Sequence, residues 1–256
     1  MTTNKKINFN IGEFTWFILL LAISFYFYKL VSSGNVTMFI SPSMSKYVLF
    51  ASIALLILGI FQLPKIINTP NGKAKFGYLI FAIPIIIGIL VDPVGLNQQI
   101  ADAKGVNVVQ NTSQTNAKAI KENSTITKNN EIILNEKNFF TYVNGINDDP
   151  NKFKDYRITL TGFVYKDDSI KHNQFVIARM LMVYCAADTQ IIGFLCNYDG
   201  QNLDKDTWVQ ITGVLDTTNY TDSSSKENFL IPLIKVQSIK KVNPPASKYV
   251  YINNTD

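Results

Sequence analysis

The sequence is poor in the residue types that build chemical sites. Only two cysteines and one histidine occur in 256 residues, and 17% of the residues are charged, below the roughly 25% of an average soluble domain. Two cysteines exclude a disulfide-dense secreted scaffold and a four-cysteine zinc site. One histidine excludes a multi-histidine metal centre within the chain. The shortage of charge, with a mean hydropathy of +0.09, indicates an apolar part joined to a soluble part.

The charge is divided unevenly between the two halves. Residues 1–130 contain 11 lysines and arginines against 4 acidic residues, whereas residues 131–256 contain 13 against 15. The pI of about 9.0 therefore arises in the apolar half. Because a nucleic-acid-binding domain needs a positive surface, the slightly acidic second half argues against an oligonucleotide ligand.

Three long runs without charge lie in the first half, which we expect to be a membrane domain over residues 1–96. They centre on FTWFILLLAISFYFY, YVLFASIALLILGIFQL and FGYLIFAIPIIIGILV, and they predict transmembrane helices over residues 14–31, 47–63 and 76–91. The first run ends in bulky aromatic residues without an A-x-A-like site, which favours an uncleaved anchor over a signal peptide. The third run is short for a membrane core of ~30 Å, so a re-entrant segment is the alternative there.

Lysines predict the orientation of these helices. Lys5 and Lys6 precede the first run, and Lys65, Lys73 and Lys75 follow the second. The positive-inside rule places both groups in the cytoplasm. With three crossings, the chain is a multi-pass protein of the cell membrane with a cytoplasmic N-terminus and an extracytoplasmic C-terminal domain. If the third run is only re-entrant, the C-terminal half is cytoplasmic instead.

None of the three runs contains an ionisable residue. Ion and proton pathways generally need such residues at depth, so three helices of this kind are not expected to form a transporter alone. Pro84 and Gly88 interrupt the third run. We treat them as a candidate docking face for a partner's helix, with a simple kink as the alternative.

The second half has a different pattern. Residues 97–130 are expected to be a polar linker, rich in Asn, Thr, Ser and Gln. An amphipathic helix around Phe139, Phe140 and Val143 then precedes strand-like segments at 157–165, 174–184, 191–197, 208–215 and 229–242. Glycines inside strands indicate bulges or barrel corners. The fold class is thus a membrane-anchored α + β protein in which residues 131–256 form a small, mostly antiparallel OB-like β-barrel, with a five-stranded sandwich as the alternative.

The residues that carry chemistry gather at the central hairpin of this β domain. Arg179, Cys185, Asp188 and Cys196 fall within 18 positions, and His172 lies just upstream. Together they offer thiolate, carboxylate and imidazole ligands for a metal ion, although no C-x-x-C or H-x-x-H spacing is present. The alternative is structural, with two small buried thiols and an arginine paired with a carboxylate.

The expected turn of this hairpin argues against a disulfide. With the turn centred on Asp188 and Thr189, Cys185 is expected opposite Ile192, and Cys196 opposite Leu181. The two thiols are then not cross-strand neighbours.

No catalytic motif is present. A nucleophile elbow, a P-loop, a paired-carboxylate signature and a credibly spaced Ser/His/Asp set are all absent from the sequence. We therefore do not expect an enzyme, and we expect no cofactor other than the metal ion considered above.

Several segments resemble the YcgQ-like membrane proteins of bacteria. The most specific is FVIARMLMVYCAAD at residues 175–188; IPIIIGILVDPVGLNQQIADAKGVN at 83–107, the Ser33-Gly34 pair and PPASKYVY at 244–251 are also similar to the family. The family carries a Cys-Cys pair where this chain has Tyr184 and Cys185. A vicinal dithiol is therefore absent from this chain.

The resemblance implies a partner, because such proteins are described as subunits of two-component permeases. It implies an accessory subunit that docks on a polytopic permease within the lipid bilayer, with an extracytoplasmic OB-like domain that caps the permease or captures its substrate. The alternative is a membrane-anchored ligand- or metal-binding sensor domain that uses Cys185, Asp188, Cys196 and His172.

Overall fold

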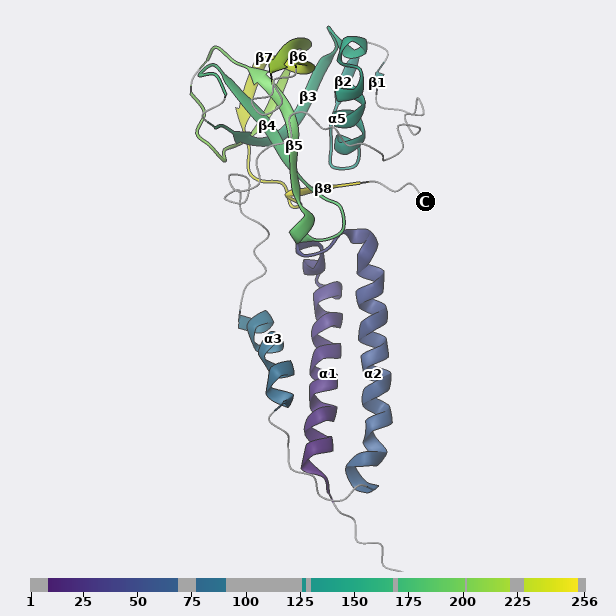
Figure 1. Ribbon diagram of the computed structural model, residues 1–256. Helices are drawn as coiled ribbons and strands as arrows, with labels where there is room; N and C mark the ends of the chain where they lie inside the picture. The colour runs from purple at the N-terminus through teal and green to yellow at the C-terminus, as the bar shows by residue number, and fades with distance from the viewer. Residues whose placement is uncertain are drawn as a thin grey trace, which may run out of the picture. The chain divides into compact units, whose positions relative to one another are not determined.

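The computed structural model describes residues 9–68, 77–90, 126–127, 130–167, 170–200, 202–221 and 228–252. The chain divides into two compact units, Met1–Leu96 and Asn97–Asp256. Helices make up the first unit and a β-sheet dominates the second (Figure 1). Almost all of the expected linker over 97–130 lies outside the described residues.

Helix α1 covers Ile11–Ser32 and begins three residues before the expected start. Asn10 is its N-cap, and its side-chain oxygen accepts a hydrogen bond from the Glu13 N–H at 3.2 Å, which satisfies one free N–H of the first turn. Glu13 therefore lies inside the helix, although the uncharged run begins at Phe14. Its carboxylate accepts a hydrogen bond from the Gln62 side chain.

Helix α2 covers Ser45–Asn68 and continues through Pro64, so the expected end at residue 63 is wrong. Proline removes one helical hydrogen bond and crowds the preceding turn, but the turn after it is anchored. Ile66 is buried, and its carbonyl accepts a hydrogen bond from the Asn10 N–H at 2.9 Å. This contact with α1 favours continuation of the helix beyond the proline.

Helices α1 and α2 pack through small polar residues. The Ser24 hydroxyl donates to the Ser52 carbonyl and the Ser52 hydroxyl donates to the Ser24 carbonyl, both at 2.8 Å. Both serines are buried in this contact. Small residues allow two helix backbones to approach closely in a membrane, and the hydroxyls here hydrogen-bond across the contact.

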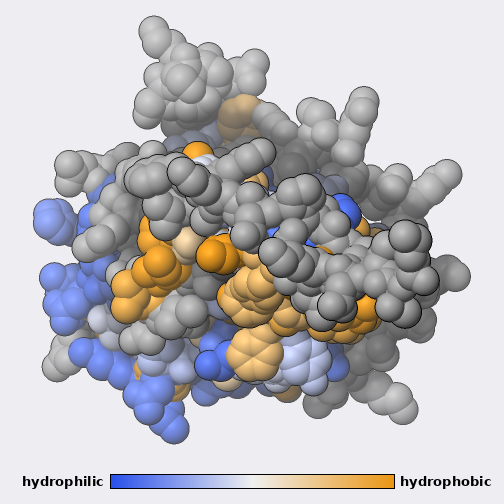
Figure 2. Space-filling view, turned by 90° about the horizontal axis from the view of Figure 1, so that it is seen from below, coloured by the Kyte–Doolittle hydropathy of each residue, from blue (hydrophilic) through white to orange (hydrophobic). Residues whose placement is uncertain are grey.

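Two helical segments among the described residues, Ile11–Ser32 and Pro42–Ile67, are long and apolar enough to cross a membrane. Helix α3 covers Tyr78–Leu90, 13 residues, which is about 20 Å at 1.5 Å per residue. A third crossing is therefore not shown. The space-filling view of Figure 2 shows apolar side chains, in orange, gathered on the face of the molecule that is seen from below. The exposed large apolar residues include Phe25, Phe50, Phe61, Ile80 and Leu90, as expected for helices that contact lipid.

The second unit contains eight described strands and one α-helix. Their bounds are β1 Ile126–Thr127, β2 Glu131–Ile133, α5 Phe139–Asp148, β3 Arg157–Tyr165, β4 Gln174–Met182, β5 Gln190–Asn197, β6 Trp208–Thr221, β7 Asn228–Lys241 and β8 Tyr249–Tyr251. Short 3-10 turns lie at Pro150–Phe153 and Ala186–Asp188. The predicted amphipathic helix is confirmed, because α5 buries Phe139, Val143 and Ile146.

The strands form one mixed sheet in the order β1-β2-β3-β6-β7-β5-β4-β8, and β3 also pairs with β4. The five long strands therefore form a closed circuit of pairings. The pairs β2–β3, β4–β8 and β5–β7 are parallel, and the other pairs are antiparallel. The predicted irregularity at a strand glycine is confirmed at Gly213, where the β6–β7 register shifts. A Cβ atom there would lie 2.5 Å from the Lys235 carbonyl oxygen, which explains why glycine is needed.

One apolar core fills the second unit. Its fully buried members include Ile132, Ile158, Ile177, Phe194 and Ile211. Each comes from a different strand, so the strands and α5 share a single core. This core holds the ends of the β4–β5 hairpin in place.

Candidate functional site

The β4–β5 hairpin has a different register from the one expected. Phe175 pairs with Cys196, Arg179 with Ile192 and Leu181 with Gln190, so the predicted pairings Cys185–Ile192 and Cys196–Leu181 are wrong. The error arises from the turn. A seven-residue loop, residues 183–189, joins the strands in place of a tight turn, because a 3-10 turn over Ala186–Asp188 lies within it.

Asp188 organises this loop. Its carboxylate accepts hydrogen bonds from the backbone N–H groups of Val183 at 3.1 Å, Tyr184 at 2.8 Å and Cys185 at 3.0 Å. Three N–H groups of the loop, which lie outside the strand pairing, are thus satisfied by one side chain. Asp188 has a structural role here, and it leaves the Tyr184 ring exposed on the loop.

The two cysteines lie in different environments, and both are free thiols. Cys196 is fully buried in the core, and burial raises the pKa of its thiol well above the usual range, because a thiolate loses its solvation there. Cys185 is partly exposed in the loop. His172 precedes β4 and therefore lies at the opposite end of the hairpin from Cys185.

These positions do not assemble the predicted metal ligands. Cys185 and Asp188 lie together, whereas Cys196 and His172 are separated from them by the length of β4 and β5. Within the described parts of the chain, no group of three His, Cys, Asp or Glu side chains is placed to hold a metal ion.

Arg179 lies on β4 with its side chain 4% exposed. It donates hydrogen bonds to the carbonyls of Ser247 at 3.0 Å and Thr161 at 3.4 Å. The Glu136 carboxylate lies 3.7 Å away, and the guanidinium carbon is 5.2 Å from the centre of the Trp208 ring. Burial lowers the pKa of Arg179, and the negative charge of Glu136 opposes this shift. The predicted pairing of Arg179 with a carboxylate is thus present.

This arginine joins the two segments of the second unit that resemble the YcgQ-like proteins. Residues 175–188 include most of β4, and residues 244–251 end in β8. The two strands pair in parallel, with Met180 opposite Tyr249 and Met182 opposite Tyr251. Ser247, whose carbonyl accepts from Arg179, donates its hydroxyl to the Tyr249 carbonyl at 3.0 Å.

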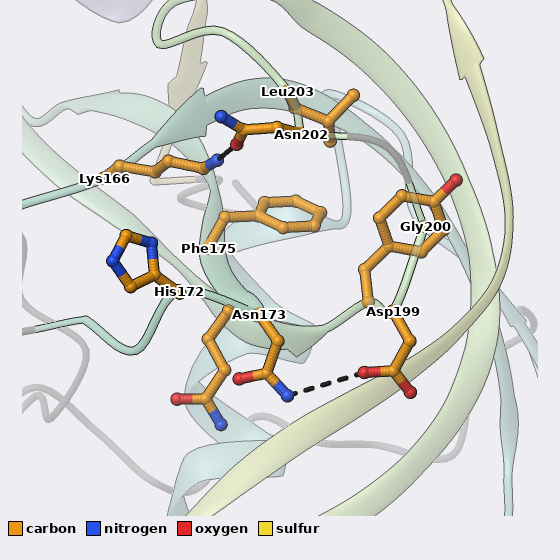
Figure 3. Close-up of a pocket in the computed structure, with 10 residues that line it drawn as sticks. Lys166, His172, Asn173, Phe175, Asp199, Gly200, Asn202 and Leu203 are labelled. Carbon is orange, nitrogen blue, oxygen red and sulfur yellow. Dashed lines mark hydrogen bonds between the residues drawn. The ribbon is translucent and has the colours of Figure 1, made fainter.

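A pocket of about 420 Å³ lies at the other end of the hairpin (Figure 3). It is lined by Lys166, His172, Asn173, Gln174, Phe175, Tyr198, Asp199, Gly200, Asn202 and Leu203. The Phe175 ring lies in the middle of the pocket, between a Lys166–Asn202 hydrogen bond on one side and an Asn173–Asp199 hydrogen bond on the other. This site was not predicted from the sequence. The signal that could have indicated it is the recurrence of amide and aromatic side chains in HNQF at 172–175 and NYDGQN at 197–202.

The predicted docking face on α3 is partly occupied within the chain. The Tyr26 hydroxyl donates to the Gly88 carbonyl at 3.4 Å, and a Cβ atom at Gly88 would collide with the Tyr26 ring. Gly88 therefore allows close approach to α1. The side chain of Pro84 lies outside the described residues.

These features define a protein with an apolar helical unit and a separate β unit, in whose described residues no group of three His, Cys, Asp or Glu side chains is placed to hold a metal ion. The chain belongs to the DUF1980 family. The family's N-terminal domain matches residues 16–107, and its C-terminal domain matches residues 109–252.

Two relatives are similar to this chain over most of its length. The UPF0703 protein YcgQ of Bacillus subtilis is 24% identical, with 91% of this chain and 98% of the relative covered. A protein of Streptococcus mutans is 26% identical, with 86% of this chain and 92% of the relative covered. Its name is "Putative two-component membrane permease complex subunit". The predicted membership of a YcgQ-like family is confirmed.

Proposed function

We propose that this protein is a non-enzymatic accessory subunit of a membrane permease complex. One observation carries the proposal: the chain aligns over most of its length with a relative that is named as a subunit of such a complex. Two apolar helices of membrane-spanning length support membrane association. The absence of charged residues from residues 14–28 and 47–63 argues that the transport path itself belongs to a polytopic partner.

In this proposal the β unit is an OB-like barrel. The circuit β3-β4-β5-β7-β6-β3 supports it, because five strands that pair in a ring leave no free edge among themselves. The order of the strands around this circuit, first-second-third-fifth-fourth, with the third and fifth parallel, is that of an OB-fold.

The β unit would act on the outer face of the membrane, where it caps the permease or captures its substrate. Lys5, Lys6 and the lysines after the second run support a cytoplasmic N-terminus. The outer location of the β unit then requires α3 and its flanking residues to complete a third crossing.

Co-purification tests the permease assignment. The full-length chain carries an affinity tag and is extracted from its own cells in mild detergent, and any complex with a polytopic membrane protein is measured by native mass spectrometry. We expect a complex of fixed stoichiometry. An unrelated membrane protein with the same tag is the control, and recovery of this chain without a polytopic membrane protein would contradict the assignment.

Cysteine labelling in intact cells tests the location of the β unit. A Cys185→Ser, Cys196→Ala background receives one reporter, either Lys152→Cys in the β unit or Ser113→Cys in the preceding segment. Lys152 is exposed, so its replacement is accessible to a maleimide. We expect a membrane-impermeant maleimide to label both reporters before lysis. Labelling only after lysis would place the β unit in the cytoplasm, and the outer-face arrangement would be wrong.

A further inference from the structure

The pocket beside Phe175 has the chemistry of a binding site, and none of the residues that support the permease assignment lines it. The segment before β4 and the segment after β5 line opposite sides of it. Phe175 is 2% exposed and Leu203 is 8% exposed, so the floor is apolar and fixed. A fixed apolar floor with a few polar groups around it is typical of small-molecule sites.

Tyr198 gives the pocket a second aromatic surface. Its ring is partly exposed, packs against the core and lies directly against Gly200, where a Cβ atom would collide with it. Glycine at position 200 therefore leaves room for the ring. The main-chain N–H of Tyr198 donates to the Asn173 carbonyl at 2.9 Å, which ties the two sides of the pocket together.

The polar groups around the floor are mostly neutral, and several are available. Within the described residues, the side chains of His172 and Gln174 and the hydroxyl of Tyr198 form no hydrogen bond. Asn202 uses its carbonyl oxygen for Lys166, which leaves its N–H groups free. The side-chain amide of Asn173 donates its N–H groups to Asn197 at 2.9 Å and Asp199 at 3.5 Å, which leaves the side-chain oxygen of Asn173 free.

The charge of the lining decides the class of ligand. Lys166 and Asp199 are the charged members and have opposite signs, so the pocket offers no net attraction to a phosphate or another anion. The free groups include both donors and acceptors. Each hydroxyl of a sugar both donates and accepts, and the C–H face of a sugar ring packs on an aromatic ring.

We propose that this pocket binds a saccharide, with the ring of one sugar unit against the partly exposed Tyr198 ring, above the buried floor, and its hydroxyls paired with Gln174, Asn173 and Asn202. The proposal concerns the chain alone and does not depend on the permease partner.

Ligand-observed NMR tests the proposal on the full-length chain in nanodiscs. Maltose, cellobiose and chitobiose are the probes, each at millimolar concentration, and saturation transfer to their ring protons reports binding. We expect at least one to bind. Tyr198→Ala and Gln174→Ala should each weaken that binding about tenfold, the scale of one lost aromatic contact or hydrogen bond. Tyr198→Trp should retain it.

Matched substitutions outside the pocket test whether a loss of sugar binding is specific to the pocket residues. Gln190 begins β5 at the other end of the same hairpin, and Tyr220 lies on β6; Gln190→Ala and Tyr220→Ala should not change binding. Failure of all three sugars to bind would overturn the proposal. Equal binding by the Tyr198→Ala and Gln174→Ala variants would also overturn it, as would displacement of a bound sugar by inorganic phosphate.

Discussion

The Arg179 guanidinium donates a hydrogen bond of 3.0 Å to the main-chain carbonyl of Ser247, 68 positions further along the chain. Strand β8 pairs with β4 immediately beyond this contact. A buried cation must be matched by acceptors because it has lost its water. Carbonyl oxygens supply that match here, at the junction that holds the C-terminal segment to the sheet. Arg179 is therefore a structural residue of the β unit.

Replacement of Arg179 should destabilise the β unit. Arg179→Leu leaves the carbonyls of Ser247 and Thr161 without this donor and removes the contact with Trp208, so we expect a loss of about 2–3 kcal/mol in the free energy of unfolding. Arg179→Lys should recover only part of it, because one ammonium group does not reproduce the guanidinium fork. Trp208 fluorescence during urea unfolding, in a Trp16→Phe background, measures the effect.

The chain provides a matched control for this prediction. Its other arginine, Arg157, is exposed at the start of β3, and Arg157→Leu should change the stability by less than about 0.5 kcal/mol. Equal losses for the two substitutions would show that the buried contacts of Arg179 contribute nothing specific.

Removal of the Asp188 carboxylate should open the loop between β4 and β5. Asp188→Ala leaves three backbone N–H groups without their acceptor, and the loss of such a cap costs about 1 kcal/mol. That corresponds to a roughly fivefold rise in the open population, so Cys185 should react about fivefold faster with maleimide. Asp188→Asn retains a neutral acceptor and should have an intermediate rate.

Cys196 and Asp199 are the controls for the loop experiment. Cys196 is buried with a raised pKa, so it should stay unreactive in every folded variant. Asp199→Ala alters an exposed carboxylate at the other end of the hairpin and should leave the Cys185 rate unchanged. An unaltered rate in Asp188→Ala would mean that the loop keeps its shape without the cap.

Much of the local structure could be predicted from the sequence, because it depends on neighbouring residues. Apolar runs without charge predicted α1 and most of α2, and alternation predicted β3 over its full length at 157–165. The predicted end of α2 at residue 63 was wrong. The Ile66 carbonyl accepts a hydrogen bond from the Asn10 N–H of another segment, and this contact outweighs the tendency of Pro64 to end the helix.

The surroundings of the candidate residues could not be predicted in the same way. Arg179 meets Glu136, Trp208 and Ser247, and no local pattern links these residues. The hairpin register depended on the length of a loop whose 3-10 turn is closed by Asp188. The pocket depends on two segments that are brought together only by the pairing of β4 with β5.

Asp216 should make the stability of the β unit depend on acid pH. Its carboxylate lies 2.5 Å from the Lys235 ammonium and 3.1 Å from that of Lys154, and it accepts from the Thr217 N–H at 2.9 Å. The pKa of Asp216 is lowered mainly by Lys235, then by Thr217 and Lys154. Because the pKa of Asp216 is lower in the folded state, its ion pairs stabilise the β unit fully at pH values above the unfolded-state pKa of about 3.9. This stabilisation is lost as the pH falls below that pKa and the carboxylate becomes protonated.

Comparison of the original chain with Asp216→Asn measures this contribution. We expect the variant to be less stable at pH 7, the difference to narrow below about pH 4, and added salt to reduce it because both lysines are largely exposed. Asp148→Asn, at the end of α5, is the control. A difference between Asp216→Asn and the original chain that does not change with pH would contradict the ion-pair origin.

The reciprocal contact of Ser24 with Ser52 should stabilise the pairing of α1 with α2. Each hydroxyl donates to the other residue's carbonyl at 2.8 Å, and hydrogen bonds between membrane helices contribute about 0.6 kcal/mol on average. Ser24→Ala and Ser52→Ala each remove one of these bonds, so each should lower the stability measured by unfolding in sodium dodecyl sulfate by about 0.6 kcal/mol, and the two effects should be nearly additive because each bond ends on a main-chain carbonyl that the other substitution leaves in place. Thr15→Ala is the control, because the Thr15 hydroxyl donates to the Ile11 carbonyl within its own helix and should not affect the pairing of α1 with α2. If neither serine substitution lowers the stability, close packing holds the helices together and the hydroxyls contribute nothing to it.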